Sequence, residues 1–291
     1  MWIFHYSPVA LKGILPGTHY RHWLLIVKGL SLLLRPKVTD ESIATAENLI
    51  QKFLLELEDL YGRGVMHYNI HQLMHLPMFV RARGPLYLYS MVPFESYNHH
   101  LQQLPTGSTN VLQQICKRFL IELVVKFGTE YSGIPGPRSW PAAGPEDKLL
   151  PMDKVQLKTL SSISRNVIAT AMPAITDSQH VYKRLLVNNL LYHSIAYEKA
   201  KVTDSTCTLV APKEVLTVHA FIQVSENSYA AVGESFSCVY FENLDYLMKV
   251  DGRPQAIAIP CNNLGPIVIK MVAGNDIFFS KFLNNYECNS E

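Results

Sequence analysis

Residues 39–62, TDESIATAENLIQKFLLELEDLYG, carry the clearest secondary-structure pattern in the chain. Apolar side chains recur there at steps of three and four residues, which places them on one face of an α-helix. Thr39 is a suitable N-cap, and Asp40 and Glu41 put negative charge at the positive end of the helix dipole. Gly62 can adopt the left-handed conformation that ends a helix. This stretch therefore predicts an amphipathic helix bounded by Thr39 and Gly62.

Helical periodicity extends around this stretch, over residues 19–128. A second strong apolar stripe, residues 112–127, begins after Ser108 and Thr109 and ends at Gly128. The other predicted helices are residues 68–80, disturbed at Pro77, and residues 94–104, between Pro93 and Pro105. The first part of the chain is therefore predicted to be a helical array.

The character of the sequence changes after a Pro-rich segment. Residues 132–151 contain five prolines and three glycines, a composition that predicts a linker. Short β-branched and aromatic runs separated by turn residues then follow, at 215–224, 229–232, 238–241, 256–259 and 266–271. The chain is predicted to be α+β, with a helical domain over 1–131, a linker over 132–152 and a mixed to β-rich C-terminal domain over 153–291.

Composition narrows the classes of function. The net charge of +2 creates no field over the whole protein, so any nucleic-acid contact must come from local patches. Five widely spaced cysteines without a C-x-x-C pair argue against a disulfide framework and a zinc knuckle, and favour a reducing compartment. The most apolar stretch, residues 23–34, is too short for a membrane span, so no membrane association is expected. Phosphate-binding loops, nucleophile elbows and H-E-x-x-H motifs do not occur in the sequence.

Three histidines, His67, His71 and His75, are spaced by four residues. A continuous helix would place all three imidazoles on one face, where two of them could bind a metal. Structural roles, metal ligation and nucleic-acid contact all remain open for them, because two ligands do not complete a metal site.

Glu95 follows an apolar pair at the start of the predicted helix 94–104. It could be a carboxylate of the first turn, stabilised by the helix dipole. It could also ligate a metal, but two-metal phosphoryl transfer needs carboxylates from separate elements, so Glu95 can only complete a site supplied elsewhere.

Several strings of residues carry a resemblance to a known family. They are YSPVALKGILP at 6–16, YRHW at 20–23, Ala46-Glu47, Tyr61-Gly62, YNIHQLMHL at 68–76, Gly84-Pro85-Leu86, Phe94-Glu95 with Asn98, and Gly107 with Gln114. In order and spacing over residues 2–118 they resemble the region that follows the main catalytic segment in CACTA (En/Spm-like) transposases of animals. Asn69, His71, His75, Gly84, Pro85 and Asn98 are the family-motif residues of this resemblance.

The resemblance implies an RNase H-like DDE transposase whose sheet is interrupted by a helical insertion before the last acidic residue. It makes Glu95 the candidate third catalytic carboxylate, a ligand of Mg²⁺ only together with two aspartates that the family carries far upstream. Those aspartates have no counterpart here, and His99 stands where relatives usually have glycine. The chain is therefore expected to be a C-terminal portion that is inactive and cofactor-free by itself.

Two functions follow as expectations. The first is a truncated DDE transposase that acts in DNA strand cleavage and transfer in the nucleus, with transposon ends and a separate N-terminal segment as partners. The second is a domesticated module of transposon origin that binds DNA or protein without catalysis; a decayed gene copy is the third alternative. The predicted DNA-contacting residues are Arg81, Arg83, Lys117 and Arg118, since neighbouring cations can bind successive phosphates.

Overall fold

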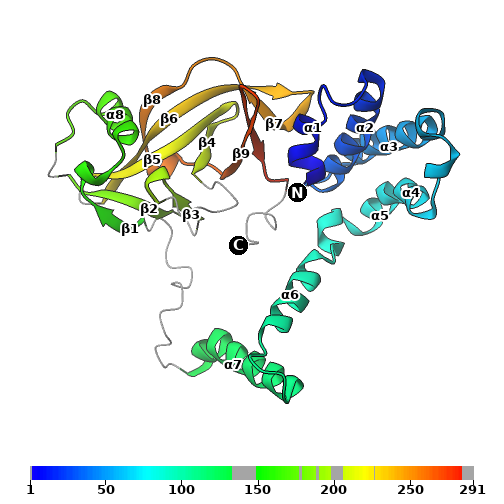
Figure 1. Cartoon of the computed structure of the whole chain (residues 1–291), viewed down its shortest axis with the longest axis horizontal. Helices are drawn as coiled ribbons and strands as arrows, with labels where there is room; N and C mark the ends of the chain where they lie inside the picture. The colour runs from blue at the N-terminus through cyan, green and yellow to red at the C-terminus, as the bar shows by residue number, and fades with distance from the viewer. Residues whose placement is uncertain are drawn as a thin grey trace. The chain divides into compact units, whose positions relative to one another are not determined.

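The structure, a computed structural model, describes residues 2–132, 149–176, 179–187, 190–197, 206–225 and 227–283 (Figure 1). It forms two compact units, Met1–Tyr87 with Asp147–Glu291, and Leu88–Glu146. Helices are combined with antiparallel strands, which confirms the predicted α+β class. Within these ranges, no helix is long and apolar enough to cross a bilayer.

The helices of the first unit follow each other closely along the chain. They are a π-helical turn Trp2–Tyr6, α1 Ser7–Ala10, α2 Gly17–Leu33, α3 Asp40–Tyr61, α4 Tyr68–Gln72, the 3₁₀ turn Leu73–His75, α5 Leu76–Arg83 and, among the strands, α8 Ser162–Ala171. The second unit contains α6, Val92–Gln103, and α7, Val111–Ser132. Short 3₁₀ turns lie at Arg63–Val65, Leu86–Tyr89, Leu157–Thr159, Ile195–Tyr197 and Cys261–Asn263.

Helix α3 confirms the prediction for residues 39–62. The Thr39 hydroxyl accepts a hydrogen bond from the Ser42 backbone N–H at 3.2 Å, and the Ser42 hydroxyl accepts one from the Thr39 N–H at 3.0 Å. This reciprocal pair is a capping box. At the other end, Gly62 has a φ of +79° and donates its N–H to the Glu58 carbonyl at 2.7 Å. The apolar face of α3 packs against α2 and α5.

The helix predicted over residues 68–80 is divided into α4, a 3₁₀ turn and α5. Pro77 lies in the first turn of α5, where its missing N–H is tolerated. A continuous helix would bring the Pro77 ring against the carbonyl of Leu73, so the division occurs between these residues. The predicted helices 94–104 and 112–127 are present as α6 and α7, and α7 continues past Gly128 to Ser132.

The strands form one antiparallel sheet within the described residues. They are β1 Leu150–Val155, β2 Val181–Val187, β3 Leu190–His193, β4 Cys207–Ala211, β5 Glu214–Ser225, β6 Ser228–Phe241, β7 Leu244–Val250, β8 Gln255–Pro260, β9 Val268–Ala273 and β10 Asp276–Lys281. Their main order is β1-β2-β5-β6-β7-β10-β9, with β3 beside β2, β4 beside β5 and β8 beside β6.

Strand β6 connects the two parts of this sheet. Its first part pairs with β5 and β8, and its last residues pair with β7. An isolated bridge between Thr208 of β4 and Ile267, next to β9, links the β9 end of the strand order to β4, which lies beside β5. The two runs predicted at 229–232 and 238–241 are therefore parts of one long strand.

The helices near the N-terminus pack against the sheet. Val27 of α2 lies in one apolar cluster with Leu247 of β7, Ile269 of β9 and Phe278 of β10. His5 is buried and its Nδ1 lies 2.6 Å from the Ser280 hydroxyl of β10. This grouping differs from the predicted helical domain over 1–131, because the apolar face of α2 is completed by strands that lie more than 200 residues later in the chain.

The predicted linker falls mostly on residues 133–148, which lie outside the described residues. Of the residues predicted as linker, Ser132 is the last residue of α7, and Leu150 and Pro151 belong to β1. Pro151 is compatible with a strand here because β1 is an edge strand of the sheet, where a missing N–H leaves no ladder bond unmade on the open side.

Candidate functional sites

Glu95 lies in the first turn of α6 with its side chain exposed to solvent. Its backbone N–H donates to the Met91 carbonyl at 2.9 Å, as expected at the start of a helix. Among the residues that the structure describes, no side chain pairs with the Glu95 carboxylate. The neighbouring Phe94 is 64% exposed. The carboxylate is therefore accessible to a ligand.

Helices α6 and α7 contact each other through side chains that follow Glu95. The rings of Tyr97 and Phe119 meet edge to face at 6.3 Å, and His100 Nε2 lies 2.9 Å from a carboxylate oxygen of Glu122. His99, the departure from the family pattern, lies 2.9 Å from the Gln103 side chain, and Asn98 is exposed. Asn98 and Glu95 are thus both on the surface of one helix.

Residues of the resembling strings at 6–16 and 20–23 have structural roles in the first unit. The Trp23 indole donates to the Ser7 hydroxyl at 2.8 Å, and Ser7 donates to the Ile3 carbonyl at 2.6 Å. The Tyr20 hydroxyl donates to the Pro8 carbonyl at 2.7 Å. These bonds attach the turn Trp2–Tyr6 and helix α1 to α2. The side chains of Ser7, Tyr20 and Trp23 therefore have a packing role.

The three histidines do not share one helical face. His67 precedes α4, whereas His71 and His75 lie with their Nε2 atoms 3.4 Å apart and their rings perpendicular. The described part of the chain contains no cluster of three or more His, Cys, Asp or Glu side chains able to hold a metal. Asn69 is exposed beside them.

Gly84 and Pro85 end helix α5. Gly84 has a φ of +89°, a left-handed conformation that favours glycine, and its N–H donates to the Val80 carbonyl at 2.8 Å. Pro85 follows at a position where the helix cannot continue. The backbone conformation at the end of α5 therefore accounts for a glycine at 84 and a proline at 85.

The four predicted DNA-contacting cations differ in their surroundings. Arg81 pairs with Glu47 at 2.8 Å, and Arg118 donates to the Leu104 carbonyl and to the Thr106 hydroxyl. Arg83 and Lys117 are exposed, and neither pairs with a carboxylate among the described residues. Only the last two are therefore free to bind phosphate without losing an existing bond.

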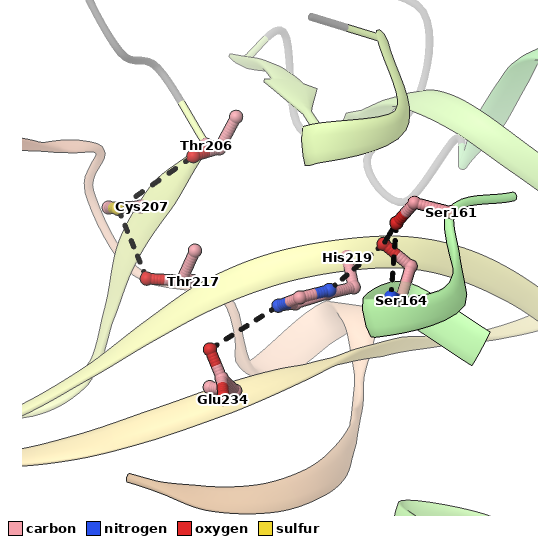
Figure 2. Close-up of polar contacts among 7 residues, drawn as sticks. All are labelled: Ser161, Ser164, Thr206, Cys207, Thr217, His219 and Glu234. Carbon is pink, nitrogen blue, oxygen red and sulfur yellow. Dashed lines mark hydrogen bonds and ion pairs between the residues drawn. The ribbon is translucent and has the colours of Figure 1, made fainter. Parts of the chain in front are cut away.

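A second polar site, which the sequence did not indicate, surrounds His219 of β5 (Figure 2). The imidazole is only 2% exposed, and its Nδ1 lies 3.1 Å from the Ser164 hydroxyl of α8. Ser161, the N-cap of α8, donates its hydroxyl to that of Ser164 at 3.0 Å. On the other side, His219 Nε2 lies 3.5 Å from a carboxylate oxygen of Glu234 in β6.

A β-bulge places His219 in this position. The register of β5 and β6 shifts between Val218 and Ala220, so His219 is the extra residue. Gly233 lies opposite, where a Cβ would come 2.0 Å from the Thr217 carbonyl oxygen. Only glycine therefore allows the close approach of the two strands at the bulge.

The electrostatics of the site favour a neutral imidazole. Burial lowers the pKa of His219 below its ordinary value; the Glu234 carboxylate opposes this shift and Lys270 adds to it. Ser164 accepts the Ser161 hydroxyl. We assign its own hydroxyl proton to Nδ1, an assignment that places the ring proton on Nε2. At 3.5 Å from Glu234, Nε2 makes no hydrogen bond with a described residue.

Ser164, His219 and Glu234 are the residue types of a hydrolytic triad, but the burial of Ser164 and His219 argues for a structural role. A nucleophile must reach a substrate, and Ser164 is 2% exposed. Its hydroxyl fixes α8 to the sheet, above an apolar cluster of Ile168, Ala220 and Val232. Nearby, the Cys207 thiol lies 3.3 Å from the Thr217 hydroxyl, and both are buried (Figure 2).

Comparison with known proteins adds no relative. The chain matches no protein-family model, no curated protein and no solved structure.

Proposed function

We propose that this chain is part of a DDE-type DNA transposase similar to those of CACTA (En/Spm-like) elements, and that Glu95 is its contribution to the catalytic carboxylates. The observation that carries the proposal is the exposed carboxylate of Glu95 in the first turn of α6, with no partner among the described residues. A carboxylate that only stabilised its helix would be expected to bond to nearby N–H groups or to pair with a cation.

The proposal assigns only one metal ligand to the described residues. Two-metal phosphoryl transfer needs several carboxylates around ions about 4 Å apart, and a single Glu does not hold such a pair. On this proposal, the two aspartates and an RNase H-like sheet belong to a preceding segment. Mg²⁺ would stabilise the attacking and leaving oxygens there, and Glu95 would provide one oxygen ligand.

The proposed substrate is DNA at transposon ends, and the proposed location is the nucleus. Arg83 and Lys117 support a DNA contact, because both are exposed cations without a carboxylate partner in the described parts of the chain. Arg81 and Arg118 would have to give up the Glu47 ion pair and the Leu104 hydrogen bond, respectively.

The test uses the natural reading frame that contains this chain together with any coding sequence upstream. The purified product should cleave DNA in Mg²⁺, and Glu95→Gln should abolish cleavage while Glu58→Gln, which changes an exposed carboxylate paired with Arg63, should not. The 291-residue chain alone should neither nick nor join DNA. Cleavage that survives Glu95→Gln would refute the assignment.

A binding module without catalysis is the second candidate function. Two exposed apolar side chains just before Glu95, Met91 and Phe94, favour it, because such side chains are typical of surfaces that bind a partner. The same experiment separates the two candidates. A natural product that binds DNA or protein but shows no metal-dependent cleavage, with or without Glu95, would support the module.

A further inference from the structure

A tyrosine lies between two lysines near the end of strand β6. The Tyr240 ring is 37% exposed, with Lys213 Nζ at 5.1 Å and Lys281 Nζ at 5.3 Å from its centroid. Lys213 belongs to the tight turn between β4 and β5, whereas Lys281 is the last residue of β10. Two cations from separate elements thus converge on one aromatic ring.

The described partners of the two ammonium groups are the Tyr240 ring and, for Lys281, the Pro212 carbonyl at 3.5 Å. Neither lysine forms an ion pair with a carboxylate in the ranges that the structure describes. Of the acidic residues next to this group in sequence, Glu242 pairs with Lys12 at 2.7 Å and Glu214 accepts a hydrogen bond from the Ser235 hydroxyl at 2.5 Å. The electron-rich face of Tyr240 attracts both ammonium groups and offsets part of their mutual repulsion. A bound anion would remove the rest of that repulsion.

We infer that Lys213, Tyr240 and Lys281 form a contact site for the phosphate backbone of a nucleic acid. Two ammonium groups held near one ring can bind neighbouring phosphates of one strand. Because the lysines lie close to the ring, Tyr240 positions the cations and does not stack on bases. Binding is therefore independent of base sequence. The inference rests on the proposed function, since it extends the DNA contact to the β-rich part of the chain.

The first test is the salt dependence of DNA binding by the full 291-residue chain in EDTA. Fluorescence anisotropy with a labelled oligonucleotide gives the slope of log affinity against log salt. Lys213→Ala and Lys281→Ala should each reduce the magnitude of this slope by about one, and lower affinity equally for unrelated sequences. Lys52→Ala removes the same charge from the Lys52–Glu56 pair on α3, and should leave the slope unchanged.

The second test separates the ring from the charges. Tyr240→Phe keeps the aromatic face and should bind DNA like the unmodified chain, whereas Tyr240→Leu should weaken binding about as much as the loss of one lysine. Thermal unfolding of each variant shows whether the fold is retained, and Tyr240→Phe provides the answer if Tyr240→Leu does not fold.

Three results would overturn the inference. The first is that both lysine variants bind DNA as tightly as Lys52→Ala does. The second is that Tyr240→Phe loses DNA binding while its fold is intact. The third is that the chain binds phosphatidylserine vesicles more tightly than DNA. Failure of the transposase proposal can be distinguished from these results, because DNA binding in EDTA does not depend on Glu95 and Glu95→Gln should leave it unchanged. Intact DNA binding with no cleavage by the natural product would refute only the catalytic assignment.

Discussion

Gly233 allows the His219 site to form. Replacing it with alanine would place a methyl group 2.0 Å from the Thr217 carbonyl oxygen, so β5 and β6 would have to separate at the bulge. We expect Gly233→Ala to lower the free energy of unfolding by about 3 kcal/mol or more, measured by urea denaturation. Gly64→Ala is the matched control, because nothing lies within 4 Å of its Cβ position, and it should be neutral or slightly stabilising. Equal effects of the two substitutions would contradict the close approach.

His219 should make the protein sensitive to acid. Its pKa is lowered on folding, so the unfolded state binds the proton more strongly, and stability falls as the pH drops below the ordinary histidine value of about 6.5. His219→Gln should decrease the loss of unfolding free energy between neutral and mildly acidic pH. Glu234→Gln should increase it, because Glu234 stabilises the protonated ring. Parallel curves for all three proteins would exclude His219 as the source.

The two sites differ in how far the sequence could predict them. Glu95 was a candidate from the sequence because helix starts are local patterns and because its neighbours resemble a family motif; its role stays a prediction. His219 lies inside an apolar run, VLTVHAFIQV, where a lone histidine looks like any residue of a strand. Its role depends on the bulge and on Ser164, which is 55 residues earlier in the chain.

At the scale of single elements, the ends of α3 show how local signals stabilise structure. Removing the Thr39 hydroxyl deletes one half of the capping box, so Thr39→Ala should destabilise the protein by about 1 kcal/mol. Thr45→Ala, at an exposed position inside the same helix, should be neutral or stabilising because alanine is the better helix former. Calorimetry would measure both variants; a Thr39 effect no larger than that of Thr45 would show that the capping box contributes little.

The helices were easier to predict than the strands for a physical reason. Helical periodicity and caps are local, and α3, α6 and α7 were found from them. Strands β7 and β10, LDYLMKV and DIFFSK, were not predicted. Apolar and polar side chains do not alternate strictly in them, because other strands and α2 both cover them. The sequence predicted β6 as two separate runs, because Gly233 lies between them and glycine is uncommon inside a strand. The glycine is needed there because β5 approaches too closely for a Cβ atom.

At the scale of the whole molecule, the sequence could not show which helices the sheet covers. The contacts are between distant residues, such as His5 with Ser280, the Phe4 carbonyl with the Tyr246 hydroxyl, and Arg35 with Asp245. Composition suggested a helical domain and a β-rich domain, because it changes at the Pro-rich segment. A change in composition along the chain indicates which kind of secondary structure lies on each side of it. It does not indicate whether the apolar faces of those helices and strands pack together.

The association of the N-terminal helices with the sheet leads to the last prediction. The composition of residues 132–151 makes this segment the expected site of protease cleavage. The two pieces should nevertheless stay together, since Val27 is fully buried against residues from β7, β9 and β10. After a single cut, gel filtration should show one species without denaturant and two fragments in urea.

A charged residue at the buried position should reverse this result. Val27→Asp would place a carboxylate without a partner in the apolar cluster, so the cut protein should separate into fragments or aggregate. Val124→Asp, at an exposed position of α7, makes the same chemical change and should leave the cut protein associated. If the fragments of the unmodified chain instead separate and each keeps its own cooperative unfolding transition, the helices and the sheet are independent domains. The buried contacts of α2 would then contribute little to stability.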